Sequence, residues 1–446
     1  MTAVVAVDFG ASSIRVCRVD LAERPPAIDV VHRVPHGPVA DGRGRLRWDW
    51  DRLVAEMDRG LAAALDHGPV ASIGADTWGV DYGLLDRRGE LVAPPVSYRD
   101  ARTDDVHREV VDRIGAERLY RTTGIQLQPF NTLFQIAADE RDQLAAARHL
   151  LMLPELLVHH LTGEITAERT SAGTTALVDI ATGDWSAELA DAVGLDTRLL
   201  APIAPAGTPV GTWRGVPVHL VGGHDTASAV AAMGAAPTAG SAFVSAGTWL
   251  LVGREQPEPD TSEAARLANF TNEAGCLGGV RFLRNLAGSW LIEGCRPAWG
   301  DRPVDELLAA AEASTAPPGA IVDVADARFL HPEDMLAEVT SAAGLARDAS
   351  PAVVVRVVVE SAAAGTADVL RRLGGVTDVH VFGGGSQSEL YRRALAERSG
   401  VPVHAGPVEA TALGNALVQG VALGVFADLA DARAHLQPLD QEFTTR

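Results

Sequence analysis

The spacing of apolar residues in the first part of the chain predicts strands that alternate with helices. Residues 4–7 form an apolar run that ends at Asp8, and residues 15–19 alternate apolar with polar side chains, so each stretch predicts a strand. Residues 51–65 place apolar side chains on one helical face, and residues 71–80 return to a strand pattern. This order of elements predicts an α/β fold.

The rest of the chain continues the alternation. The expected elements are helices over residues 103–119, 133–151, 226–233, 353–373 and 390–399, and strands over residues 218–221 and 379–382. Ser350 and Pro351 are typical of a helix start, so a long buried helix is expected after them despite its β-branched residues. Ser386 and Glu389 fit a capping box that opens the helix over 390–399.

Two stretches share one plan, in which a strand, a turn of small residues and a second strand form a hairpin. The first turn is Gly10-Ala11-Ser12-Ser13, and the second is Ala246-Gly247-Thr248. Backbone N–H groups and small hydroxyls at such a tip suit phosphate oxygens, although an ordinary tight turn has the same composition. One copy in each half predicts a duplicated fold that closes on a nucleotide from two sides. The linker is expected over residues 235–240, which are rich in Ala, Pro and Gly.

Composition excludes several classes of function. The chain has 446 residues and a net charge of −20, which argues against nucleic acid and anionic membranes as partners. No apolar run approaches the roughly 20 residues of a membrane helix, and no charged-then-apolar leader precedes the first strand. The three cysteines show no metal-binding or disulfide spacing, so a cytoplasmic location is expected.

The sequence contains no lysine, which excludes a P-loop and Schiff-base chemistry. Phosphate would then be held by backbone N–H groups, hydroxyls, arginine or a metal ion. Asp8, at the end of the first strand, is a candidate holder of hydrated Mg²⁺, although it could equally cap its own turn.

His224-Asp225-Thr226 lies where a strand meets a helix. An aspartate there could accept a proton from an attacking hydroxyl, the role of the base in phosphoryl transfer, with its neighbours orienting it. The structural alternative is an Asp225 that caps the helix.

Three further groups could bind a ligand or be structural. Gly383-Gly384-Gly385-Ser386 follows a strand and precedes a helix, where a ligand can approach the backbone closely. Residues 76–81 combine Trp, Gly and carboxylates that could bind a sugar or form a buried core. Asn285, with Arg284 and Gln128, could bind hydroxyls.

These motifs together resemble the FGGY family of carbohydrate kinases. The matching stretches, in the order that the family has them, are residues 7–13, 76–81, 97–103, 224–230, 245–249 and 383–387. Further stretches at 124–126, 129–133, 269–273 and 406–410 resemble the branch of the family that phosphorylates L-rhamnulose.

The resemblance implies a duplicated actin-like (ribonuclease H-like) ATPase fold, with two domains around a central cleft. Residues 1–236 would form an N-terminal sugar-binding domain and residues 237–446 a C-terminal nucleotide-binding domain. It further implies that ATP, with Mg²⁺, phosphorylates a sugar hydroxyl, expected to be O1 of L-rhamnulose in L-rhamnose catabolism. The implied partners are the sugar and ATP, and the chain is expected to be a monomer or a homodimer.

The resemblance also assigns roles to residues of this sequence. Asp225 occupies the position of the catalytic base, and Asp8 is kept as the metal-side carboxylate. The substrate-binding positions are Gly79, His224, Thr226 and Asn285. The phosphate and nucleotide positions are Ala11, Ser12, Ser13, Arg15, Thr248 and Gly384.

Three residues depart from the family pattern. Ile14 stands where a small residue is usual, Ala246 stands where a second hydroxyl is common, and Glu293 stands where a glutamine is found. The first two predict a bulkier first tip and one phosphate contact fewer in the second, and thus an effect on nucleotide affinity.

Other functions are compatible with the same motifs. A kinase of the family that acts on L-fuculose, L-ribulose, D-xylulose or a polyol would show the same pattern. A non-catalytic actin-like sensor of sugar or nucleotide would bind ATP without sugar-dependent ADP release. A hydrolase that uses Asp225 and His224 would not bind ATP.

Overall fold

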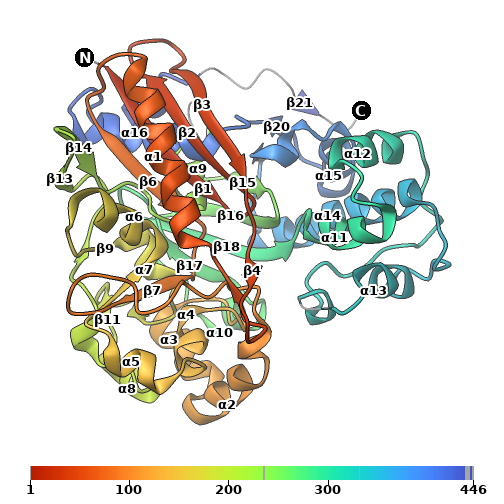
Figure 1. The fold of residues 1–446 in the computed structure, drawn as a ribbon. Helices are drawn as coiled ribbons and strands as arrows, with labels where there is room; N and C mark the ends of the chain where they lie inside the picture. Colours follow the sequence, from red (N-terminus) through yellow and green to blue (C-terminus); the bar gives the residue numbers. More distant parts are fainter. Residues whose placement is uncertain (1, 235–236, 331, 437–441, 444–446) are drawn as a thin grey trace. The chain divides into compact units, whose positions relative to one another are not determined.

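The computed structural model describes residues 2–234, 237–330, 332–436 and 442–443 (Figure 1). The chain forms two compact units, each assembled from segments that are far apart in the sequence. Unit 1 combines Met1–Ala236, Glu255–Phe282 and Ala410–Gln437, and unit 2 combines Pro237–Arg254, Leu283–Glu409 and Pro438–Arg446.

The predicted domains, 1–236 and 237–446, are each continuous in the sequence, whereas each unit combines separate segments of the chain. The structure gives two later segments, Glu255–Phe282 and Ala410–Gln437, to unit 1. Part of the expected linker, residues 235–236, lies outside the described residues.

Unit 1 is built on a six-stranded mixed sheet. Its strands, in spatial order, are β13 (Pro209–Trp213), β14 (Val216–His219), β6 (Ile73–Thr77), β1 (Ala3–Gly10), β2 (Ser13–Asp20) and β3 (Ala27–Pro35). β1 pairs antiparallel with β2 and parallel with β6, and all eight of its residues are buried. A strand covered on both faces explains why residues 4–7 form a continuous apolar run instead of an alternating one.

Helices cover both faces of this sheet. On one face lies α1 (Trp50–Asp66), where a Cβ added at Gly60 would collide with Val16; Figure 1 shows α1 lying along the strands. On the other lies α16 (Ala410–Ala422), which shares a hydrophobic cluster with Cys17. Neighbouring residues of a strand point to opposite faces of the sheet, so Val16 points toward α1 and Cys17 toward α16. The packing of α16 on the sheet explains why Ala410–Gln437 belongs to unit 1.

The helix whose first residue is Asp225, the predicted catalytic base, packs against α16 at very short range. This helix, α9 (Asp225–Ala231), consists mainly of small residues, as expected. Gly414 of α16 lies so close to it that a Cβ would overlap the carbonyl group of Ser228. The crossing fixes the position of the α9 N-terminus on unit 1.

The other elements of unit 1 are mostly short. They are β4 (Val39–Ala40), β5 (Leu46–Arg47), β7 (Tyr82–Leu85), η1 (Ala101–Thr103), α2 (Asp104–Ile114), α3 (Ala116–Thr123), α4 (Thr132–Ala137), α5 (Arg141–Ala146), β8 (His149–Met152), α6 (Leu153–Thr162), β9 (Ala167–Glu168), α7 (Arg169–Gly173), β10 (Val178–Asp179), β11 (Asp184–Trp185), α8 (Ala187–Ala192), η2 (Thr197–Leu199), β12 (Ile203–Ala204), α10 (Glu263–Leu267), β17 (Thr271–Ala274) and α17 (Leu429–Arg433).

Two predicted helices of this region are wrong in their extent. The helix expected over 103–119 is divided between α2 and α3, because Gly115 adopts a φ of 94°. The helix expected over 133–151 is replaced by α4, α5 and the strand β8, which pairs antiparallel with β7. Pairing with a distant strand outweighs the local helical pattern there.

Unit 2 contains all or part of the remaining elements. These are β15 (Ser241–Ala246), β16 (Trp249–Gln256), β18 (Val280–Ala287), α11 (Trp290–Cys295), η3 (Arg296–Trp299), α12 (Val304–Glu312), η4 (Ala327–Phe329), α13 (Met335–Ala342), α14 (Pro351–Leu373), β19 (Asp378–Phe382), η5 (Gly384–Gln387), α15 (Glu389–Ser399), β20 (Val403–Ala405) and β21 (Glu442–Phe443). β15 pairs antiparallel with β16 and parallel with β19, which pairs parallel with β20.

The long helix of unit 2 is confirmed, and one predicted helix cap is wrong. α14 starts at Pro351, and the Ser350 hydroxyl caps it by accepting a hydrogen bond from Val353 N. The capping box of Ser386 with Glu389 does not form, because Ser386 lies in η5 and donates to the Gly383 carbonyl. Ser388 caps α15 instead.

Cys17, Cys276 and Cys295 are all buried, and none of these three described residues forms a disulfide bond. Among the described residues, no helix is both long and apolar enough to cross a membrane.

Candidate functional site

The carboxyl end of β1 places a carboxylate and a guanidinium side by side. Asp8 lies opposite Arg15 in the antiparallel register of β1 with β2, so their side chains leave the same face of the sheet. Arg15 Nη2 lies 3.2 Å from Asp8 Oδ2, and the Asp8 side chain is fully buried. Gly10 makes room for this pair, since a Cβ there would lie 2.8 Å from Arg15 Nη2. The structure therefore brings two predicted site residues together.

A second carboxylate, Asp76, stands beside Asp8 on the neighbouring strand. The two residues are partners in the parallel register of β1 with β6. Asn415 of α16 donates to Asp76 Oδ2 over 2.6 Å, while Oδ1 has no hydrogen-bond partner among the described residues. Burial, and then the charge of Asp8, raise the pKa of Asp76 well above its usual value. Asp76 was not predicted as a metal-side residue, although its place at a strand end was a signal.

Asp225 forms the first residue of α9. His224 Nε2 lies 3.5 Å from Asp225 Oδ1, and the Thr226 hydroxyl donates to the same oxygen over 3.2 Å. The Asp225 side chain is one-quarter exposed. Burial raises its pKa, and the neighbouring His224 opposes that rise. The carboxylate is thus held in place and can still be reached.

A buried glutamate fixes the backbone that leads into α9. Glu168 accepts a hydrogen bond from Gly223 N over 3.0 Å, and the Thr170 hydroxyl accepts one from His224 N over 3.1 Å. Thr77 N donates to the Gly223 carbonyl over 2.9 Å, which ties the loop to β6. Glu168 was not predicted from the sequence, because nothing in its local pattern separates it from a surface residue.

The predicted sugar-binding turn lies next to His224. A Cβ added at Gly79 would lie 3.4 Å from the His224 ring. The next residue, Val80, has a φ of 68°, which is rare for a β-branched residue. Its carbonyl accepts hydrogen bonds from Thr132 Oγ1 at 2.7 Å and Gln135 Nε2 at 3.1 Å. Strain of this kind persists only where the surrounding structure holds it.

Asp81 anchors the other end of this turn. It accepts hydrogen bonds from the indoles of Trp48 at 2.7 Å and Trp78 at 2.9 Å. Burial raises the pKa of Asp81 to about 6, against the effect of these donors. Trp78 is only 5% exposed, so its ring belongs to the core and does not offer a face for stacking on a sugar.

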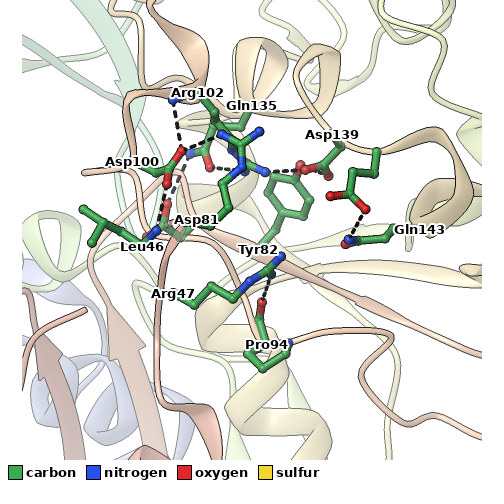
Figure 2. Close-up of polar contacts among 12 residues, drawn as sticks. Leu46, Arg47, Asp81, Tyr82, Pro94, Asp100, Arg102, Gln135, Asp139 and Gln143 are labelled. Atoms are coloured by element: carbon green, nitrogen blue, oxygen red, sulfur yellow. Dashed lines mark hydrogen bonds and ion pairs between the residues drawn. The ribbon is translucent and has the colours of Figure 1, made fainter. Parts of the chain in front are cut away.

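A network of buried polar side chains connects Asp81 to Gln135, Arg102 and Asp139. Gln135 donates to Asp81 Oδ1 over 3.2 Å, and Arg102 Nη2 donates to Gln135 Oε1 over 2.9 Å. Figure 2 shows the Arg102 guanidinium between Gln135 and Asp139, with which it forms an ion pair. Tyr82 donates to the same Asp139 over 2.5 Å. These contacts make the turn at residues 78–81 rigid.

The tip of the first hairpin carries the predicted phosphate-side residues. Ser12 is exposed at the turn, with Ala11 and Ser13 half-buried on either side. Arg99 Nη2 donates to the Ala11 carbonyl over 3.1 Å, and His36 Nε2 lies 2.8 Å from the Gly10 carbonyl. The carbonyls of this tip are therefore engaged by side chains.

In unit 2, the second hairpin and the glycine turn lie against each other. A Cβ at Gly385 would lie 2.5 Å from the Ala246 methyl group, so the two segments pack at backbone distance. The neighbouring Gly384 has open space around its Cα, and Thr248 is half-buried at the hairpin tip. Asn285 lies on β18, half-buried.

The structure shows where the side chains of the three residues that depart from the family pattern lie. Ile14 is fully buried, whereas Ser13 and Arg15 lie on the opposite face of β2, so it does not make the tip bulkier as expected. Ala246 is 3% exposed, so its side chain is in the interior and not at the tip. Glu293 pairs with Arg296 over 2.5 Å.

Comparison with known proteins identifies the family. Residues 3–233 match the N-terminal domain model of the FGGY family of carbohydrate kinases, and residues 242–423 match its C-terminal domain model. The chain is 37% identical to a rhamnulokinase of Enterococcus faecalis, over 97% of this chain and 92% of the relative. It is also 37% identical to a rhamnulokinase of an Enterobacter species, over 96% and 91% of the two chains.

Solved structures confirm the fold. A ligand-bound xylulose kinase from Lactobacillus acidophilus matches with a TM-score of 0.79 at 16% identity, over 100% of this chain and 94% of the other. A glycerol kinase from Plasmodium falciparum with ADP matches with a TM-score of 0.76 at 15% identity, over the same shares. The predicted two-domain α/β kinase fold is thus confirmed.

Proposed function

The chain belongs to the FGGY family of carbohydrate kinases, and we propose that this ATP-dependent sugar kinase acts on L-rhamnulose. The γ-phosphoryl group of ATP would be transferred to O1 of the sugar, giving L-rhamnulose 1-phosphate and ADP. The observation that carries this choice is the 37% identity to two rhamnulokinases across nearly the whole chain. A cytoplasmic location, and a monomer or homodimer, remain predictions.

Asp225 is proposed as the general base. Its carboxylate accepts the proton of the reacting hydroxyl as the oxygen attacks phosphorus. Two features support this role: the side chain is partly exposed at the start of α9, and burial raises its pKa above the usual value of an aspartate. His224, Thr226 and Gly79, which adjoin it, would bind sugar hydroxyls. Asn285, on β18, would contribute a further polar contact to the sugar.

The phosphates of ATP are assigned to the two hairpins. Backbone N–H groups at Ala11, Ser12 and Ser13, with the Arg15 guanidinium, would hold phosphate oxygens on unit 1. Thr248 and Gly384 would contact the nucleotide on unit 2. Since the chain has no lysine, backbone N–H groups, hydroxyls, arginine and a metal ion are the groups left to hold phosphate.

The residues around Asp8 fit a magnesium ion. Asp8 and Asp76 offer carboxylate oxygens on adjacent strands, and one oxygen of Asp76 is buried without a hydrogen-bond partner in the described structure. Within the described ranges, no group of three His, Cys, Asp or Glu residues could hold a metal. Mg²⁺ commonly binds through one or two carboxylates, water and substrate phosphates, which this arrangement suits. The bound ion would neutralise charge on the phosphates of ATP.

The substrate is tested by coupled ADP release with L-rhamnulose, L-fuculose, L-ribulose, D-xylulose and glycerol. The highest kcat/KM is expected for L-rhamnulose. Activity on a different sugar alone would overturn the substrate and keep the kinase class. ATP binding with no sugar-dependent ADP release would instead favour a sensor.

The base is tested by Asp225→Asn. Loss of a general base lowers kcat by about 10²–10⁴-fold, and ATP affinity should stay unchanged. Asp191→Asn, at an exposed position of α8, serves as the matched control and should retain full turnover. Turnover of Asp225→Asn at the wild-type rate would remove Asp225 from this role.

A further inference from the structure

A buried ion pair lies behind His224. Glu273 comes from β17 and Arg281 from β18, and their side chains are 6% and 0% exposed. Arg281 Nη2 lies 3.1 Å from Glu273 Oε2, and Arg281 Nε donates to the Ala274 carbonyl over 3.0 Å. Burying two charges costs desolvation that their attraction often only balances, so stability alone is a weak account of this pair.

The pair touches one edge of the His224 ring, and Asp225 lies at the other. His224 Nδ1 is 3.2 Å from Glu273 Oε2 and 3.3 Å from Arg281 Nη2. On the opposite edge, Nε2 is 3.5 Å from Asp225 Oδ1. The imidazole therefore lies directly between the ion pair and the proposed base.

These contacts restrict where the ring can carry its proton. Of the two neighbours of Nδ1, Arg281 is its hydrogen-bond partner, whereas Glu273 Oε2 has no hydrogen-bond partner among the described residues. When Nδ1 accepts from Arg281, the single proton of the neutral ring is on Nε2. When Nδ1 donates to Glu273, a bare Nε2 would turn its lone pair toward the Asp225 carboxylate, and only a doubly protonated ring avoids that repulsion. Both favourable arrangements protonate Nε2.

We infer that Glu273 and Arg281 are positioning residues that hold the His224 ring with a protonated Nε2 toward Asp225. The inference rests on the proposed function for its catalytic consequence. An Nε2–H donor beside a carboxylate acceptor can bind one sugar hydroxyl from both sides, with His224 donating to its oxygen and Asp225 accepting its proton. Asp225 has other polar neighbours as well. Thr226 forms a hydrogen bond with it, and Arg15 and Asp76 act on it through their charges.

The electrostatics of Glu273 agree with this geometry. Burial works to raise the pKa of Glu273, but the charge of Arg281 and the close contact with His224 outweigh it and hold the pKa below its usual value. Glu273 therefore remains an anion against the ring.

A double-mutant cycle tests the inference through catalysis. Glu273→Gln should lower kcat/KM for the sugar by about 10- to 100-fold, the range known for metal-bound histidines that lose an orienting partner, with KM for ATP unchanged. Combining Glu273→Gln with His224→Gln should cost no more than His224→Gln alone, because Glu273 acts through that ring. Additive losses, or an equal rise in KM for ATP, would overturn the inference. Glu263→Gln, in an exposed ion pair with Arg266, is the matched control and should match the wild type.

The position of the proton on the His224 ring can also be measured by spectroscopy, without turnover and without a variant of Glu273 or Arg281. In wild-type protein with ¹⁵N-labelled histidine rings, the His224 signals are assigned by their loss in His224→Gln. A protonated Nε2 supports the inference, whether the ring is neutral or charged. A neutral ring with its proton on Nδ1 overturns it. Because the spectrum is recorded without sugar or ATP, it decides the inference even if no tested sugar is phosphorylated.

Discussion

The two hairpins that carry the proposed phosphate contacts share a backbone plan, but different groups surround their tips. Around the first tip lie charged and ionisable side chains. Asp8 pairs with Arg15, Arg99 donates to the Ala11 carbonyl, and His36 contacts the Gly10 carbonyl.

Backbone groups dominate around the second tip. The Thr248 carbonyl accepts hydrogen bonds from Gly288 N at 3.0 Å and Trp290 N at 3.1 Å, and the Gly247 carbonyl accepts one from Ser289 N at 3.0 Å. Gly385 then packs against Ala246 without a side chain of its own.

The difference indicates two ways of building a phosphate-binding tip without lysine. The first hairpin depends on charge, so removing a charge should impair it most. The second depends on close backbone packing, so adding a single carbon should impair it most.

The largest effect is expected from Asp8→Asn. The change removes the carboxylate charge that pairs with Arg15 and one of the two carboxylates proposed for Mg²⁺, so kcat should fall by about 10²–10³-fold. Thr248→Val in the second hairpin should cost only about 10-fold, the value of one hydrogen bond to a charged group. Rates of ADP release across a MgCl₂ series measure both. Equal losses in the two variants would contradict the proposed division between charge and backbone.

Gly385→Ala should destabilise unit 2. The new Cβ would lie 2.5 Å from the Ala246 methyl group, and overpacking of this kind costs about 1–3 kcal/mol. Thermal unfolding measures the change. The control is Gly384→Ala at the adjacent residue, where nothing lies within 4 Å of the added carbon. If the two alanine variants unfold together, the close packing at Gly385 does not contribute to stability.

His36 should make the stability of the first hairpin depend on pH. Burial lowers the pKa of His36 from 6.5 to about 4, against the hydrogen bond to Gly10. Because the folded state resists protonation, the stability contribution is complete above pH 6.5 and is lost as the pH falls toward 4. The loss between pH 6.5 and 5 is roughly 2 kcal/mol. Unfolding of the wild type and His36→Gln over this range measures it, and identical pH dependence would contradict the prediction.

Local sequence patterns predicted the elements that form from nearby residues. The helices α1 and α14 and the strands of both hairpins match their predicted positions within a few residues. Asp8 could be selected because a strand end and a turn are visible in the sequence, whereas Arg15 was assigned to the phosphate side only through the family resemblance. His224, Asp225 and Thr226 were found through a short motif that the family resemblance made specific.

Contacts between distant segments could not be predicted in this way. Asn415 bonds Asp76 from more than 300 residues away, and Glu168 reaches Gly223 across 55 residues. Glu273 and Arg281 contact His224 from another part of the chain, and no local pattern identifies such partners. The strand β8 was predicted as helix for the same reason, because its partner β7 lies far away in the sequence.

The smallest effect is expected from Ala246→Ser, which restores the hydroxyl that relatives commonly carry. A new hydrogen bond to phosphate would lower KM for ATP by about 2- to 10-fold. However, the Ala246 side chain is buried against Gly385, so the added hydroxyl would point into the interior of unit 2 and not toward the tip. KM for ATP should therefore change by less than about twofold, while thermal stability falls slightly because a polar group is buried. Steady-state kinetics and thermal unfolding measure the two effects. A clear drop in KM with unchanged stability would show that position 246 faces the nucleotide after all, and would make the second hairpin depend on side chains as the first one does.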